Sequence, residues 1–183
     1  MARAKSFLGT DASVPAGALR PLPLALQHGE LAERYLGAER AEDHERAGVA
    51  ATAAMERAES AAEWWAADLW GHRALWHFER AGMELAATRA ARLIGDLRAS
   101  AGDPASARRY YAEAISEARD IGAEREEGLA ALGMGRAAMQ LSDVTTARRL
   151  AAIAIDLLER CGAPADEVAA ARELRGQEKE VSG

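Results

Sequence analysis

The histidines are the side chains best suited to acid–base or metal chemistry, and their spacing suits neither. They stand at positions 28, 44, 72 and 77. Carboxylate-bridged di-iron bundles place Glu three residues before the ligating His, but Ala25, Ala41, Leu69 and Ala74 stand there. Asp68 and His72 share a helical face, which allows half of a metal site or a simple helix hydrogen bond. His44, among acidic neighbours, is expected to be a solvated helix residue. We predict no metal ligand and no cofactor.

No set of residues with the spacing of a catalytic site appears either. Cys161 is the sole cysteine, and it ends a predicted helix, where the helix dipole disfavours a thiolate nucleophile. Gly133-Met-Gly135 lies inside a predicted helix with no preceding strand and no following Lys-Ser/Thr, unlike a phosphate-binding loop. The sequence therefore favours a protein that is not an enzyme.

Charge and hydropathy restrict the partners. Lys and Arg total 23 against 29 Asp and Glu, a net charge of -6, and the two signs are interleaved. Without a basic stripe, direct nucleic-acid binding is disfavoured. No run of about 18 apolar residues suits a membrane span, and the N-terminus lacks a secretory signal. We expect a cytoplasmic protein that does not enter membranes.

The tryptophans, by contrast, are concentrated in one short stretch. They stand with one phenylalanine on a predicted helix that is apolar around much of its surface, a pattern typical of a helix buried on several sides. The N-terminal leucines and Tyr35 would then cover it. The alternative is an aromatic interface for a partner or for self-association, since Trp is a favoured anchor. The aromatic residues of this candidate interface are Trp64, Trp65, Trp70, Trp76 and Phe78.

Composition and spacing then indicate the elements that hold these residues. About a quarter of the chain is alanine, and Ala, Glu, Lys, Leu and Arg make up about half, which favours helices. Gly82, Gly122 and Gly162 are spaced by 40 residues. At the same spacing lie paired alanines seven residues apart, where small side chains let helices approach closely. These alanines are Ala67 and Ala74, Ala107 and Ala114, and Ala147 and Ala154.

Each 40-residue unit reads as two helices. Asp103-Pro104 and Asp143 are expected N-caps and starts of second helices, and Gly122 and Gly162 are expected left-handed C-caps. The turn near residues 59–62 is the least clear, because it lacks Gly and Pro. The predicted organisation is a flexible arm at 1–21, an N-terminal capping helix region at 22–42, a repeat domain at 43–175 and a flexible tail at 176–183. The repeat domain comprises units 43–82, 83–122 and 123–162 and a cap at 163–175.

This pattern resembles the tetratricopeptide (TPR) repeats, in the variant with units near 40 residues that occurs in bacterial signalling proteins. Ile94-Gly95 matches the Leu-Gly step of the first helix, and Ala107, Tyr111 and Ala114 match the second. Unit three keeps Met134-Gly135, Ala147 and Ala154 but has Ala151 at the aromatic position. Unit one keeps only Ala67 and Ala74, which leaves open another α-solenoid or an irregular bundle.

The resemblance implies an all-α fold, a right-handed α-solenoid of stacked antiparallel helical hairpins with about three repeats and a C-terminal capping helix. It implies a concave face that binds a protein or peptide. Asp96 stands where a carboxylate clamp would need Asn, so no such clamp is expected, although the arginines could hold an acidic segment. Alternatively, Arg92 and Asp96 are a solvated i,i+4 pair. The concave-face residues that the resemblance implies are Arg89, Arg92, Asp96, Arg136, Met139 and Gln140.

The function expected from these patterns is binding of another protein or peptide by a helical-repeat adaptor or scaffold. The alternative is a ligand- or peptide-sensing accessory domain in bacterial signalling or transcription regulation. Neither the identity of a partner nor the oligomeric state follows from the sequence.

Overall fold

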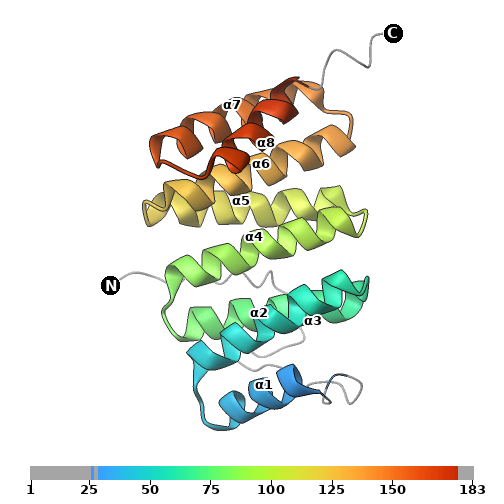
Figure 1. Ribbon diagram of the computed structural model, residues 1–183, viewed down its shortest axis with the longest axis vertical. Coiled ribbons are helices and arrows are strands. Elements are labelled where there is room, and N and C mark those ends of the chain that lie inside the picture. Colours follow the sequence, from blue (N-terminus) through green and yellow to red (C-terminus); the bar gives the residue numbers. More distant parts are fainter. Residues whose placement is uncertain (1–25, 27–28, 177–183) are drawn as a thin grey trace. The chain divides into compact units, whose positions relative to one another are not determined.

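The described part of the chain is entirely helical. A computed structural model describes residue 26 and residues 29–176, and no strand occurs among them. Figure 1 shows consecutive helices running back and forth as hairpins, which confirms the predicted all-α class of stacked helical hairpins. The helices are α1 (Glu30–Arg40), α2 (His44–Ser60), α3 (Trp64–Arg80), α4 (Glu84–Ser100), α5 (Pro104–Asp120), α6 (Glu124–Gln140), α7 (Val144–Arg160) and α8 (Ala165–Gly176).

The helices follow a period of 20 residues, half of the period visible in the sequence. Helices α2 to α7 have 17 residues each and begin at residues 44, 64, 84, 104, 124 and 144. The two predicted helices of each unit are thus confirmed. The predicted arm, the first residues of the capping region and the tail beyond residue 176 lie outside the described residues. Gly176, predicted to open the tail, is the last residue of α8.

One turn type joins all these helices. Its middle residue has a positive φ, and the next residue donates its N–H to a carbonyl five positions earlier, as in the bond from Asp103 N to Arg98 O (2.8 Å). This is the Schellman C-cap, which satisfies carbonyls at a helix end. The turn at 61–63, unclear in the sequence, has the same geometry with Ala62 at φ 56. The positive-φ residues are Glu42, Ala62, Gly82, Gly102, Gly122, Ser142 and Gly162.

Aspartate caps begin three of the helices. The side chains of Asp43, Asp103 and Asp143 accept hydrogen bonds from the backbone N–H three residues ahead, at 3.0, 3.0 and 3.1 Å. These bonds occupy one of the N–H groups that a helix start leaves without a partner. The caps predicted at Asp103 and Asp143 are confirmed, and Asp43 adds one that the sequence pattern did not single out.

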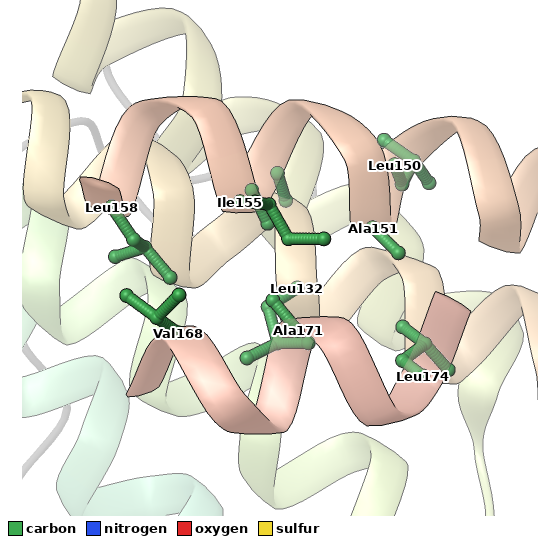
Figure 2. Packing of buried hydrophobic residues seen from close by; sticks show 10 residues of the cluster. Leu132, Leu150, Ala151, Ile155, Leu158, Val168, Ala171 and Leu174 are labelled. Carbon is green, nitrogen blue, oxygen red and sulfur yellow. The ribbon is translucent and has the colours of Figure 1, made fainter. Parts of the chain in front are cut away.

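The chain divides into two compact units, Met1–Ala90 and Ala91–Gly183, and the division falls within α4. In the first unit, α2 packs against both α1 and α3. In the second, α6 packs against α5, α7 and α8, and α7 packs against α8. Figure 2 shows the apolar side chains between α7 and α8, where Leu158 and Val168 point toward each other.

Small residues lie where neighbouring helices approach most closely. All six alanines of the 40-residue spacing are at most 1% exposed, as predicted. Helical glycines act in the same way by seating a large side chain. A Cβ added to Gly95 or Gly133 would lie 2.8 or 2.5 Å from Cε1 of Tyr111. Tyr111 therefore fills the space between α4 and α6 that these two glycines leave open.

None of the described helices is both long enough and apolar enough to cross a bilayer.

Candidate functional site

Two of the six expected concave-face residues are bonded within the fold. In the second unit, Arg92 Nη1 lies 2.6 Å from Asp96 Oδ2, and Arg92 Nε lies 2.8 Å from Oε2 of Glu126. The Arg92 side chain is only 12% exposed. The i,i+4 pair considered as an alternative is present, but it is part of a link between α4 and α6 rather than a solvated pair.

A third helix joins this cluster through a tyrosine. The Tyr111 hydroxyl of α5 donates to Asp96 Oδ1 at 2.7 Å. Burial raises the pKa of Asp96, and the Arg92 guanidinium and this hydrogen bond act in the opposite direction. The Arg92–Asp96–Glu126–Tyr111 cluster is therefore a buried polar network that joins α4, α5 and α6.

The other concave-face residues are placed differently. Arg136 and Gln140 of α6 are exposed, and Met139 is partly buried and packs against the core of the second unit. Arg89 is exposed on the part of α4 that belongs to the first unit. Arg136 and Gln140 thus remain free to contact a partner, whereas Met139 contributes mainly to packing.

The aromatic residues divide into core and surface. Trp70 is 4% exposed and Phe78 6%, so both belong to the core and not to an interface. The Trp70 ring meets the edge of Tyr35 at a centroid distance of 5.1 Å, so α1 covers this part of α3, as the buried interpretation expected. Trp64 and Trp65, in the first turn of α3, are 38% and 58% exposed.

Trp76 is half-buried, and its surroundings reveal a second polar cluster in the first unit. Its ring contacts the rings of His44 and His77 edge-on and carries the Arg80 guanidinium 5.5 Å from its centroid. His44, expected to be solvated, lies with Nδ1 3.0 Å from Nδ1 of His77. That expectation was wrong because the chain folds α3 back over the first residue of α2.

Hydrogen-bond chemistry assigns the protons along this cluster. Tyr35 Oη donates to Glu39 Oε1 at 2.9 Å, since a carboxylate can only accept. Its oxygen then accepts from Arg73 Nη1 at 2.9 Å and from Nε2 of His77 at 3.0 Å. Neutral His77 with its proton on Nε2 must accept at Nδ1, so His44 donates there.

Burial controls the titration of this cluster. Desolvation lowers the pKa of His77 to about 4, and the nearby His44 and Arg73 lower it further in the same direction. Burial also raises the pKa of Tyr35 to about 12. The cluster joins α1, α2 and α3 through a neutral imidazole, a role that no spacing in the sequence indicated because its members are separated by as many as 42 positions.

The remaining candidates for chemistry are local. His72 Nδ1 lies 2.7 Å from the backbone oxygen of Asp68, which is the helix hydrogen bond considered for this pair. Cys161 is exposed, with Sγ 3.4 Å from the carbonyl oxygen of Leu158. Among the described residues, no three His, Cys, Asp or Glu side chains are grouped as metal ligands would be.

A groove of about 470 Å³ lies between α1 and α2 on the first unit. Its lining is mostly apolar and includes Val49, a large hydrophobic residue that is 58% exposed. Sequence reasoning missed it, because small residues on two short helical stretches do not by themselves indicate an open surface. The lining residues are Leu31, Glu33, Arg34, Gly37, Ala38, Ala41, Asp43, Glu45, Arg46, Val49, Ala50 and Ala53.

No protein-family model matches the chain, and no curated protein matches its sequence. The geometry of these surfaces is therefore the basis for any statement about function.

Proposed function

We propose that this chain is a non-enzymatic helical-repeat protein that binds another protein or a peptide. The observation that carries the proposal is the exposure of two adjacent tryptophans, Trp64 and Trp65, at the start of α3. Tryptophan is the residue most enriched among the anchors of protein interfaces. Burying the exposed part of Trp65 against a partner would contribute roughly 2–3 kcal/mol.

The surroundings of the tryptophan pair suit a binding site. A hollow of about 380 Å³ lies at the same end of α3, lined in part by Ala61, Glu63 and Ala66. An exposed aromatic pair next to a hollow with both polar and apolar walls offers an anchor and a place for a partner side chain. The TPR-like arrangement of hairpins, with the exposed Arg136 and Gln140 as further contacts, is part of this proposal.

The proposal is tested by affinity purification of the full chain with quantitative mass spectrometry. We expect a stoichiometric partner that is lost with Trp64→Ser and Trp65→Ser combined. Leu141→Ser is the matched control, since Leu141 is also a large exposed hydrophobic residue, at 42%, but lies in the second unit. A partner retained by the tryptophan variant, or lost equally from the control, would contradict binding through this pair.

The alternative function is a sensory accessory domain for a small ligand or peptide, and the α1–α2 groove is the observation that favours it. Its volume of about 470 Å³ lies within the range of small-molecule sites. A metabolite that raises the melting temperature of the purified chain, with no protein partner recovered, would support this alternative over the first proposal.

A further inference from the structure

The α1–α2 groove occupies a place in the repeat where another helix belongs. A shift of 120 residues, six periods of 20, superposes the register of α1 on α7 and that of α2 on α8. Within the second unit, α6 packs against both α7 and α8. The groove positions Leu31 and Ala38 correspond to Ala151 and Leu158, which are fully buried in the cluster that includes residues of α6. Their counterparts on α1 have no such cover in the described part of the first unit.

Gly37 provides independent support, because the space above it is open. A Cβ at Gly37 would have no heavy atom within 4 Å. Other glycines inside described helices each seat a large side chain from a neighbouring helix. The pairs are Gly48 with Phe78, Gly95 and Gly133 with Tyr111, Gly128 with Leu158, and Gly135 with Leu174. Gly37 is therefore a seat of the same kind on the wall of an open groove.

The charges beside the groove indicate the chemistry of its occupant. Arg34 is paired with Glu30 at 2.6 Å, and Arg46 with Asp43 at 3.3 Å, so both arginines are engaged on their own side of the groove. Glu33 of α1 and Glu45 of α2 are exposed and have no ion-pair partner among the described residues. The unmatched charge on both walls is negative, which favours basic residues on the occupant.

We propose that the α1–α2 groove binds an amphipathic helix of a partner protein, whose apolar stripe places a bulky side chain over Gly37 and whose basic residues face Glu33 and Glu45. This inference rests on the proposed protein-binding function and adds the class of partner. The helix would lie as α6 lies on α7 and α8, so main-chain approach is set by small residues and specificity by the side chain over Gly37.

Two other occupants fit less well. The sequence before residue 26 carries Pro15, Pro21 and Pro23, and proline interrupts helices, which disfavours a helix as long as α6 from this chain. The α8 helix of a second copy would have to bury its exposed residues Asp166, Arg172 and Glu173 in an apolar groove.

The test uses the full chain and a fluorescent synthetic peptide of 17 residues, the length of α6, made of Leu and Lys with helical amphipathic spacing. We expect saturable binding by fluorescence anisotropy, weakened by salt, and much weaker binding of the matched peptide with Glu in place of Lys. Gly37→Leu should fill the seat and reduce affinity about tenfold or more. The control is Ala152→Leu, an exposed position on α7, which should leave affinity unchanged.

A second variant guards against misfolding of the first. Glu33→Lys combined with Glu45→Lys changes only exposed side chains and should reduce Lys-peptide affinity about tenfold while restoring binding of the Glu peptide. Equal binding of the two peptides by the native chain, or no effect of either variant, would overturn the proposal.

The other occupants give distinct results, each of which would also overturn it. A dimer that Gly37→Leu converts to a monomer in sedimentation would identify a second copy. Higher peptide affinity after Phe7→Ser and Leu8→Ser would identify the N-terminal segment. A failed peptide test with a partner still captured through Trp64 and Trp65 would refute this inference alone. Loss of the tryptophan-dependent partner with retained peptide binding would instead refute the binding surface named above.

Discussion

At the scale of the residue, the fold depends on glycines whose missing side chain is filled by a neighbour. Gly133→Ala would bring a Cβ within 2.5 Å of the Tyr111 ring, and such overpacking should lower the free energy of unfolding by about 1–3 kcal/mol. Gly37→Ala has open space, so it should raise that free energy by about 1 kcal/mol through helix propensity alone. Urea denaturation measures both changes. Shifts of the same sign would contradict the distinction between a filled and an open seat.

The Tyr111 hydroxyl makes a second, separable contribution at this scale. Tyr111→Phe keeps the ring over Gly95 and Gly133 but removes the hydrogen bond to Asp96. We expect a loss of about 1–3 kcal/mol at neutral pH, because a largely desolvated carboxylate loses a donor. Since burial raises the pKa of Asp96, the loss should shrink in acid as this carboxyl becomes protonated. A loss that is independent of pH would indicate that only packing had changed.

At the scale of the element, the turns test whether one geometry serves with and without glycine. Ala62 adopts φ 56, a conformation that costs a residue with a Cβ about 1 kcal/mol relative to glycine. Ala62→Gly should therefore stabilise the chain by roughly that amount. Ala61→Gly is the matched control, because Ala61 has φ -90 and gains nothing from glycine. Thermal melts of the two variants decide the matter, and a gain at Ala61 equal to that at Ala62 would count against the strain.

Helix boundaries were predictable because they depend on local signals. Asp103-Pro104, Asp143 and the glycines of the 40-residue spacing each carry the chemistry of a cap or a turn. The turn at Ala62 was unclear because its signal is absent and the regular length of the neighbouring helices imposes it. The cluster of Tyr35, His44 and His77 was not predictable, because it arises only when three helices pack and its residues have no shared spacing.

That cluster gives the first unit a specific dependence on pH. The folded pKa of His77 is about 4, below its ordinary value of 6.5. Above pH 6.5 both states are neutral and its contribution is complete. As the pH falls from 6.5 to 4, the unfolded state takes up a proton that the folded state does not, and stability decreases. We expect a loss on the order of 2 kcal/mol across this window.

The measurement is urea denaturation at several pH values, followed by tryptophan fluorescence. His77→Gln should remove most of the slope between pH 6.5 and 4, because glutamine cannot be protonated there. His72→Gln is the control, since His72 bonds only within its own helix turn at the backbone of Asp68. An unchanged slope in the His77 variant would assign the pH dependence to carboxylates instead.

At the scale of the whole molecule, alanine has two roles that composition alone could not separate. The alanines at the 40-residue spacing are buried between helices, and their positions were predictable from periodicity. Others, such as Ala41 and Ala53, line the open α1–α2 groove. Periodicity identifies both sets as helix faces that allow close approach, but only the packing shows which faces are already covered. For that reason the core was predictable from the sequence and the candidate binding surface was not.

The same separation applies to the tryptophans, and the full chain provides the test. All four lie in the first unit, with Trp70 buried and Trp64 and Trp65 exposed among the described residues. If these two are accessible in the complete molecule, acrylamide should quench a large part of the emission. Trp64→Phe combined with Trp65→Phe should then remove most of the accessible component and shift the remaining emission to shorter wavelength, because Trp70 lies in an apolar environment. If the double variant leaves the accessible component unchanged, another part of the chain covers the pair. The tryptophans would then act in folding, as the buried interpretation of the sequence held, and not in binding.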